Sequence, residues 1–343
     1  MRALAFALVV ALLAGCSLPA PAPAATATPS AATSTPTAST PAVTPGFVEP
    51  SFDGERALAH VRAQVLRDDG SVRHRVPGTE GNEEAARIIE RELSALGFDV
   101  ARHAFTATYG CEEVAMRNVV AQRNGTSGRV VVFAAHFDTR PIAEKDPDPA
   151  NRSRPIPGAN DGGSGVGVLL ELARVLPPAN DTLRLAFFDG EDGGGYKGAS
   201  CTDWILGSRA YASSLGPEDL ATIRALVLVD MVGDPGLRLP WEKGSREGPG
   251  APLLDRLWGI AHGLGHRQFV NATDLAITDD HAPFLDLGVP AVDVIHLTGD
   301  RSVFPATHHT QSDDLAHVSA ASLAAVGRTL ETWWRQDVAG VSS

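Results

Sequence analysis

The sequence predicts a three-layer α/β/α domain built around a mixed, mostly parallel central sheet. Short apolar runs that suit strands buried on both faces alternate along the chain with segments whose apolar residues recur at helical spacing. Several of these runs stop abruptly at aspartate, glutamate or histidine. Because ligands bind beyond the carboxyl ends of the strands in open α/β sheets, these polar residues are the candidates for a functional site.

Length and charge limit the possible classes of protein. The 343 residues, 43% hydrophobic and 20% charged, suit one large domain or two small ones. The formal net charge of −12 argues against nucleic acid or an anionic membrane surface as a partner.

Residues 1–15 have the pattern of a lipoprotein signal peptide. A positive start, Met1-Arg2, precedes an apolar stretch over residues 3–13 that is too short to span a bilayer. The next residues, Leu13-Ala14-Gly15-Cys16, resemble a bacterial lipobox, which implies cleavage before Cys16 and lipidation of its thiol; a secretory signal with an incidental cysteine is the alternative. We therefore expect an exported protein, lipid-anchored to a bacterial membrane on its periplasmic or cell-surface side.

Residues 16–51 predict a disordered tether, and residues 52–338 a folded catalytic domain. From Ser17 to Val48 the chain contains no charged residue and consists almost entirely of proline, alanine, threonine and serine. Such a segment cannot bury enough apolar area to offset the entropy lost on ordering.

Cys111 and Cys201 are the only other cysteines. An exported compartment is oxidising, which favours a disulfide between them. The sequence does not show that the two residues meet, so two free thiols remain the alternative.

Helices are predicted where apolar residues recur at a spacing of about 3.6. Gly97 follows the second of these segments as its terminating residue, and small residues in the third permit close packing on a sheet. In chain order the segments are Asp53–Leu66, Glu83–Leu96, Ser164–Leu176, Gly207–Leu215, Ala251–Leu264 and Ser319–Trp334.

Strands are predicted where residues alternate or form a short apolar run. The first two alternate, and an Asn124-Gly125 turn follows the second. The others are apolar enough to be buried on both faces. In chain order the runs are Phe98–Ala107, Val114–Gln122, Arg129–Ala135, the run that starts at Leu183, Ile223–Val229 and Pro290–His296.

The run from Leu183 ends in an acidic elbow, Asp189-Gly190-Glu191-Asp192. Three carboxylates in four positions repel one another unless a cation is present, although a solvated acidic turn would have the same sequence. Further strand ends carry His136 and Asp230, while Asp161 opens a helix and His309 lies near the end of the chain. Nitrogen and carboxylate ligands suit zinc, so five potential ligands with a spare glutamate indicate a zinc site rather than isolated structural residues.

From about Pro77 to Trp334 the chain resembles the zinc aminopeptidases of the bacterial leucyl-aminopeptidase type and their relatives, the animal-type glutaminyl-peptide cyclotransferases. The resemblance implies that Asp161, Asp192 and His309 bind zinc and that Glu191 is the general base. It also matches His136 and Asp230 to the remaining ligands of the two-zinc aminopeptidase site. The motifs that carry it are HFD (136–138), GANDGGSGVGVLLELAR (158–174), FFDGED (187–192), GSR (207–209), LVDMVGD (228–234), DDHAPF (279–284), GVP (288–290) and HHTQSDD (308–314).

Two positions depart from the pattern of these relatives. Most carry Glu-Glu where this chain has Glu191-Asp192, so the shorter Asp192 must approach the metal more closely. The cyclotransferases usually place a tryptophan at His308, where it packs on the substrate. Trp204, in the loop after the elbow, is a candidate for the missing aromatic wall; a partly exposed packing role is the alternative.

Three features resemble the cyclotransferases more than the aminopeptidases. The separation between His136 and Asp161 is long, Asp279-Asp280-His281 takes the place of Ser-Asp-His, and Phe304-Pro305 precedes His309. The resemblance implies that Asp279 shares a proton with Asp230, which disfavours a second zinc. It also implies that Phe304 lines the substrate pocket, as we expect of His308.

The implied activity is zinc-dependent cyclisation of an N-terminal glutamine to pyroglutamate with release of ammonia. The implied partners are peptide or protein N-termini that begin with glutamine, and we expect a monomer. The alternative function is that of an exported zinc aminopeptidase, which removes N-terminal residues. A metal-free binding ectodomain, as in the transferrin receptors, is disfavoured because every implied ligand and the base are present.

Overall fold

A computed structural model describes residues 49–273 and 275–340. The predicted signal peptide, the lipidation site Cys16 and nearly all of the predicted tether lie outside the described residues. The described part forms a six-stranded sheet in the order β1-β2-β4-β3-β5-β8. Its strands are β1 (Asp99–Tyr109), β2 (Glu112–Arg123), β3 (Val130–His136), β4 (Thr182–Phe188), β5 (Ile223–Asp230) and β8 (Ala291–Ile295).

The sheet is mixed, with its parallel part at the centre. Strands β4, β3, β5 and β8 are parallel, whereas β1 and β2 are antiparallel to their neighbours. His136 pairs with Phe188 in register, so β3 and β4 end level with each other. A separate two-stranded sheet pairs β6 (Leu239–Trp241) with β7 (Phe269–Thr273).

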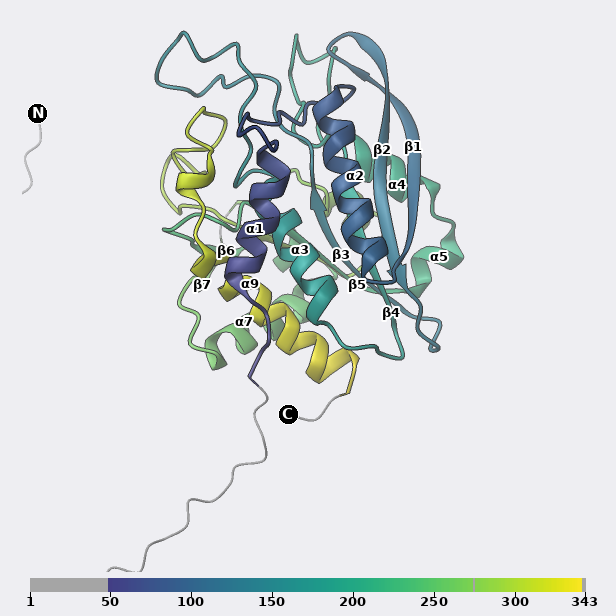
Figure 1. Cartoon of the computed structure of the whole chain (residues 1–343). Helices are drawn as coiled ribbons and strands as arrows, with labels where there is room; N and C mark the ends of the chain where they lie inside the picture. The colour runs from purple at the N-terminus through teal and green to yellow at the C-terminus, as the bar shows by residue number, and fades with distance from the viewer. Residues whose placement is uncertain (1–48, 274, 341–343) are drawn as a thin grey trace, which may run out of the picture. The chain divides into compact units, whose positions relative to one another are not determined.

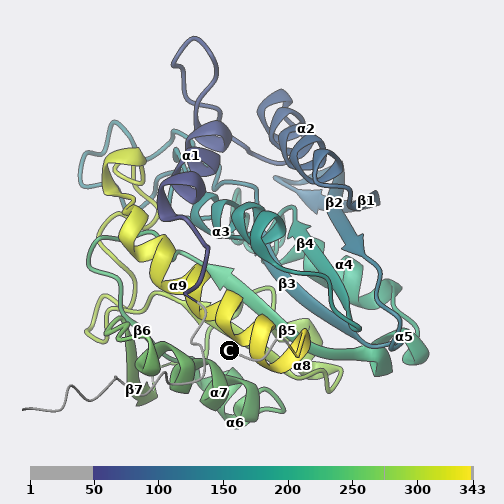
Figure 2. The same ribbon diagram turned by 60° about the horizontal axis from the view of Figure 1, so that its bottom comes forward.

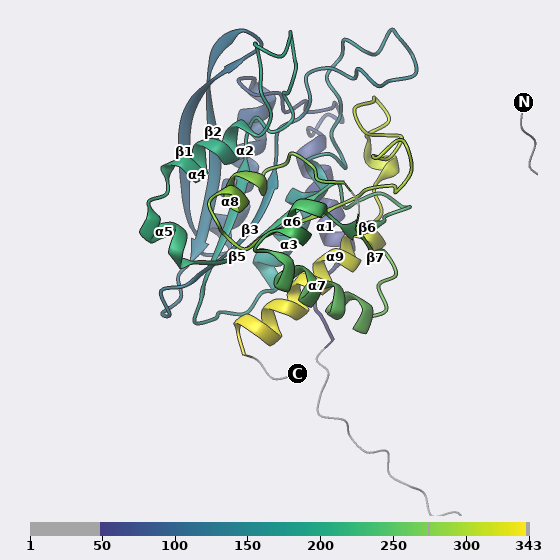
Figure 3. The same ribbon diagram turned by 180° about the vertical axis from the view of Figure 1, so that it is seen from behind.

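Helices cover both faces of the sheet, which confirms the predicted α/β/α layers. Alternate residues of β3 point to opposite cores: Val131 and Phe133 belong to one apolar cluster, Val132 to the other. The first face is covered by α1 (Gly54–Val65), α2 (Glu80–Ala95), α3 (Gly163–Val175), α7 (Ala251–Gly263) and α9 (Ala320–Trp333) (Figures 1 and 2). The second face carries α4 (Leu206–Ser214), α5 (Pro217–Thr222) and α8 (Ala282–Asp286) (Figure 3).

Small residues let α3 approach the sheet. A Cβ atom on Gly165 would overlap the carbonyl oxygen of Val229 on β5, so a larger residue would push the helix away. Gly162, with φ +77°, turns the chain into α3 beside the ring of His136. This packing brings the start of α3, with Asp161, to the carboxyl ends of the central strands.

Several short elements are absent from the predicted set: α5, β6, α6 (Lys243–Glu247), β7, α8 and the 3₁₀ helix Leu315–His317. Helix α2 begins at Glu80 rather than Glu83, because the Thr79 side chain caps it by accepting a hydrogen bond from the Asn82 backbone. Helix α9 continues into a π-helix over Trp334–Val338. In the described part of the chain, no helix is both long and apolar enough to cross a membrane.

Strands β1 and β2 are longer than predicted. They are joined by the two-residue turn Gly110-Cys111, whose φ values of +62° and +68° suit the tight turn of a hairpin. Cys111 in this turn forms a disulfide with Cys201 in the loop after β4.

Candidate active site

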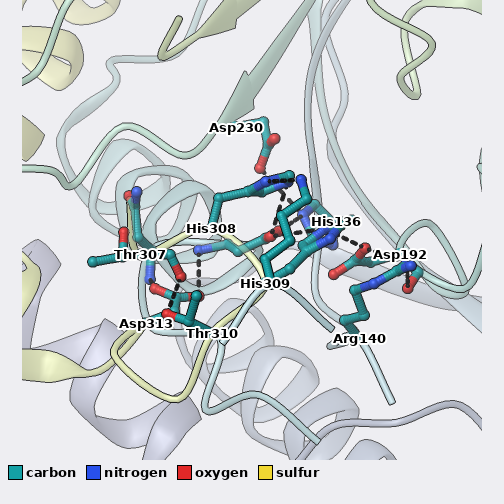
Figure 4. Close-up of polar contacts among 12 residues, drawn as sticks. His136, Arg140, Asp192, Asp230, Thr307, His308, His309, Thr310 and Asp313 are labelled. Atoms are coloured by element: carbon teal, nitrogen blue, oxygen red, sulfur yellow. Dashed lines mark hydrogen bonds and ion pairs between the residues drawn. The ribbon is translucent and has the colours of Figure 1, made fainter. Parts of the chain in front are cut away.

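The carboxyl ends of the central strands bring the candidate ligands together. His136 ends β3, Asp230 ends β5, and Asp192 follows β4. Asp161 lies just before α3. His309, labelled in Figure 4, comes from the loop after β8. All five ligands suggested by the sequence therefore meet at one edge of the sheet, and they form two overlapping groups.

The inner group consists of His136, Asp161 and Asp230. His136 Nε2 lies 3.2 Å from Asp161 Oδ1 and 3.1 Å from Asp230 Oδ1. One ligand atom from each residue lies within 4.8 Å of the others, which is close enough for one metal ion. His136 is 1% exposed, so this group is closed to solvent on the histidine side.

The outer group consists of Asp161, Asp192 and His309. His309 Nε2 lies 3.1 Å from Asp192 Oδ1 and 3.8 Å from Asp161 Oδ2. Asp161 therefore belongs to both groups, with one oxygen toward each. A second histidine, His308, lies close to the outer group, its Nε2 atom 4.0 Å from Asp161 Oδ2.

An ion-pair chain supports the outer group from behind. Glu144 Oε1 lies 2.7 Å from His309 Nδ1, and Arg140 donates to Glu144 Oε2 at 2.7 Å and to Asp192 Oδ1 at 3.3 Å. Burial alone would raise the pKa of Glu144, but His309 and Arg140 lower it to about 2. A carboxylate on the second ring nitrogen is the arrangement that orients a metal-binding histidine.

Two buried carboxylates shape the backbone that carries the candidate ligands. Asp138 accepts hydrogen bonds from the backbone N–H groups of Glu191 and Asp192, at 3.0 and 3.2 Å. Asp313 does the same for Asn160 and Asp161, at 2.8 and 3.2 Å. These bonds fix the acidic elbow and the turn before α3.

The charge balance of the two groups fits a metal cation. Burial would lower the pKa of His309, but Asp192 and Glu144 raise it to about 9. Burial would also lower the pKa of His136. The carboxylates of Asp138, Asp161 and Asp230 outweigh burial and raise this pKa well above its usual value. Asp192 Oδ2 is buried with no hydrogen-bond partner in the described part of the chain. Carboxylate and imidazole donors that attract positive charge and retain a free oxygen suit zinc.

A cavity of about 360 Å³ opens onto the outer group. Glu191 and Asp279 line it and contribute no atom to either ligand group. Burial, followed by the charges of Asp279 and Asp192, raises the pKa of Glu191 well above its usual value, although His136 opposes this. Burial and the charge of Asp230 raise the pKa of Asp279 to about 7. Asp279 is thus suited to hold or accept a proton near neutral pH, and burial favours the protonated form of Glu191.

Aromatic side chains form the cavity wall. The Trp204 ring stacks on the His309 ring with centroids 6.3 Å apart, and the Phe304 and His308 ring centroids are separated by 4.2 Å. Lys145 Nζ lies 2.7 Å from His308 Nδ1. The three residues predicted to bind substrate, Trp204, Phe304 and His308, therefore all line the cavity.

Sequence reasoning missed Arg140, Glu144 and Lys145. They lie in or beside the long loop at residues 141–157, where no periodicity indicates which side chain turns inward. The one usable signal is chemical: a metal-binding histidine needs a carboxylate partner. That rule predicts an acidic residue near His309 but does not identify Glu144.

The family model for peptidase family M28 matches residues 118–333. The chain belongs to peptidase family M28. This M28 chain is 28% identical over 286 residues to the glutaminyl-peptide cyclotransferase-like protein of Bos taurus, covering 75% of this chain and 70% of the relative.

Solved structures of other M28-like proteins have the same fold. The glutaminyl cyclase of Porphyromonas gingivalis matches with 32% identity and a TM-score of 0.76, over 84% of this chain and 99% of that one. A Zn-dependent exopeptidase from Parabacteroides distasonis matches with 32% identity and a TM-score of 0.75, over 83% and 98%. The resemblance drawn from the sequence is confirmed. M28 membership and two sets of residues close enough to hold a metal ion, one of His136, Asp161 and Asp230 and one of Asp161, His308 and His309, together indicate a metal-dependent enzyme.

Proposed function

We propose that this M28 enzyme is a glutaminyl-peptide cyclotransferase that holds one catalytic zinc in the outer group. It would convert an N-terminal glutamine into pyroglutamate and release ammonia. The observation that carries the proposal is the position of Asp279, a buried carboxyl that lines the same cavity as Glu191 and Asp230. Glu191 can carry the one proton that either reaction moves, so Asp279 is left to hydrogen-bond the departing amide nitrogen, which is its role in the cyclotransferase reaction.

The cavity suits the first residue of a peptide. Its volume of about 360 Å³ accommodates one side chain of glutamine size, and its wall of Trp204, Phe304 and Ile277 covers the aliphatic part of that side chain. The carboxylates that line the cavity attract the N-terminal amine of the peptide. Binding in this way would hold the amine and the side-chain amide within reach of each other, and such positioning supplies a large part of the rate of an intramolecular reaction.

The reaction forms one carbon–nitrogen bond and breaks another. The α-amine nitrogen attacks the side-chain amide carbon, the ring C–N bond forms, and the bond to the amide nitrogen breaks. Glu191 accepts the proton that the amine loses and returns it to the departing nitrogen, which leaves as ammonia. Asp279 and Asp230 hydrogen-bond that nitrogen as it departs. Zinc, when bound, supplies Lewis-acid polarisation of the amide carbonyl.

The inner group supports a second candidate function, that of an exported zinc aminopeptidase. His136, Asp161 and Asp230 lie close enough together that they would hold a second metal ion, and Asp161 would belong to both sites. Metal analysis of extensively dialysed protein separates the two functions. One tightly held zinc per chain agrees with the cyclotransferase, and two zincs would favour the aminopeptidase.

A direct test offers the same purified protein a glutamine-initiated peptide and a leucine-initiated chromogenic amide. The proposal expects ammonia release and a product lighter by the mass of ammonia from the first substrate, with no chromophore released from the second. Cleavage of the leucine amide without cyclisation would overturn it.

We also propose that the enzyme is a monomer anchored outside the cytoplasm through lipidated Cys16. The lipobox at residues 13–16 and the uncharged segment after it support this location. Labelling with a radioactive fatty acid should mark the wild-type protein and not a Cys16→Ser variant, and release of the wild-type protein from membranes by salt alone would contradict the anchor.

A further inference from the structure

One wall of the cavity is carried by an irregular loop. Residues 193–205 connect the acidic elbow to α4 and contain no helix or strand. Trp204, near the end of this loop, stacks on the ring of His309, and the guanidinium carbon of Arg140 lies 5.0 Å from the indole centroid. The position of the indole therefore depends on what holds the loop.

The tip of the β1–β2 hairpin holds it. Strand β2 pairs with β4 only over Val119–Arg123, so the outer half of the hairpin extends past the sheet, paired only with itself (Figure 1). At the tip, Cys111 is bonded to Cys201 through the disulfide, and its backbone N–H donates to the Cys201 carbonyl at 3.1 Å. The neighbouring Gly110 N–H donates to Thr202 Oγ1 at 2.7 Å.

The constraint reaches Trp204 within three residues. Thr202, next to the disulfide, accepts a hydrogen bond from Gly195 N–H at its carbonyl oxygen, 3.0 Å away, which folds the loop back on itself. The indole of Trp204 lies directly against Gly194, where a Cβ atom would overlap the ring. The loop backbone is thus the platform for the indole, and the disulfide fixes that platform to the hairpin.

We propose that the Cys111–Cys201 disulfide is a positioning element for substrate binding: it sets the place of Trp204 and hence the shape of the cavity wall. The inference rests on the proposed function for its assay but not for its geometry. Cys111 is exposed and Cys201 partly exposed, so a reductant can reach the bond.

The candidate metal ligands do not depend on this bond. Asp138 holds the backbone of Glu191 and Asp192, and the far end of the loop is secured where Ile205 N–H donates to the Glu191 carbonyl at 3.0 Å. Loss of the disulfide should therefore change the KM for the peptide and leave kcat and the zinc content nearly unchanged.

The test compares the wild-type holoenzyme with a Cys111→Ser/Cys201→Ser variant, each with and without reductant. The reductant is a phosphine, because dithiol reductants would themselves bind zinc. We expect reduction of the wild type, or the double substitution, to raise KM by about threefold to tenfold, as when one aromatic contact is weakened. The double variant is the matched control and should not respond to the reductant. The same changes in a Trp204→Ala background should alter KM by less than about twofold, because the contact is already absent.

Two outcomes would overturn the inference: an unchanged KM after loss of the disulfide, or a rise in KM that persists in full in the Trp204→Ala background. An independent readout covers the case in which glutamine peptides are not substrates. The fluorescence of Trp204 is obtained by subtracting the emission of Trp204→Phe from that of the wild type. Its quenching by acrylamide should increase on reduction, because a displaced indole is more accessible to the quencher. An unchanged quenching constant would refute the positioning role whatever the reaction is.

Discussion

The two ligand groups share Asp161 but differ in how they meet solvent. In the outer group all three residues line the cavity, and Arg140 and Glu144 brace two of them from behind. In the inner group His136 is fully buried and does not reach the cavity. A catalytic zinc needs one coordination position open to substrate. Only in the outer group does every ligand residue line the cavity through which substrate would reach the metal. The difference shows that access, rather than the number of ligands, separates a catalytic group from a closed one.

Asp279 adds a second difference. Its charge interaction is with Asp230, an inner-group residue, and burial followed by that interaction raises its pKa to about 7. A carboxyl that keeps a proton beside Asp230 makes the inner group a weaker site for a second cation.

The largest effect on activity is expected from Glu191→Gln, which changes no residue of either ligand group. Glutamine keeps the size of the side chain but cannot accept the proton of the amine, so turnover should fall by at least ~10²-fold. Zinc content, measured by atomic emission, should stay at the wild-type level. Loss of zinc together with activity would show that Glu191 is a ligand and that the roles of Glu191 and Asp192 are reversed.

Asp279→Ser should act on the inner group. Cyclisation of a glutamine peptide should fall by about 10²-fold, because the departing nitrogen loses its carboxyl partner. Asp230 should then ionise fully and the inner group should bind an additional zinc, measured by metal titration of the folded variant. Asp286→Ser, at an exposed aspartate on α8, is the matched control. Leucine-amide cleavage by the wild type that Asp279→Ser leaves intact would mean that the enzyme is an aminopeptidase.

Glu144→Gln should weaken the outer group without touching the inner one. Removing the charge behind His309 should lower zinc affinity by about 10- to 100-fold, as for other carboxylates that orient a metal-binding histidine. Competition with a chromophoric chelator measures this directly. Glu112→Gln, an exposed glutamate at the start of β2, should have wild-type affinity. Equal affinities for Glu144→Gln and the control would place the catalytic metal in the inner group.

Sequence reasoning located four of the candidate ligands, His136, Asp161, Asp192 and Asp230, because they lie at or near the start or end of a regular element. His309 lies in a loop, and only the family resemblance identified it as a ligand. Strand β3 stops at His136 and β5 at Asp230, and the parallel order of the central strands brings those ends to one edge. The apolar runs indicated where these strands end, because a strand buried on both faces has an unbroken apolar sequence. This signal was strong for β3, in which every residue is buried.

The supporting residues could not be found in this way. Glu144 reaches His309 across 165 positions, and its loop has no periodic pattern. Short elements such as β6 and α8 were missed because three to five residues do not establish a period. What decides their positions is tertiary packing, which no local stretch of sequence records.

The smallest effect concerns the stability of the metal-free protein. His309 has an ordinary pKa of 6.5, which Asp192 and Glu144 raise to about 9 in the fold despite burial. A raised histidine pKa stabilises the fold fully below pH 6.5, and that stabilisation is lost as the pH rises through about 9. The shift corresponds to about 3 kcal/mol at most. Urea unfolding of chelator-treated wild type should therefore show a larger loss of stability from pH 6.5 to 9 than chelator-treated His309→Gln, which keeps the inner histidine and so isolates the outer group. Identical pH profiles for the two metal-free proteins would mean that the outer group does not hold a proton in the absence of metal.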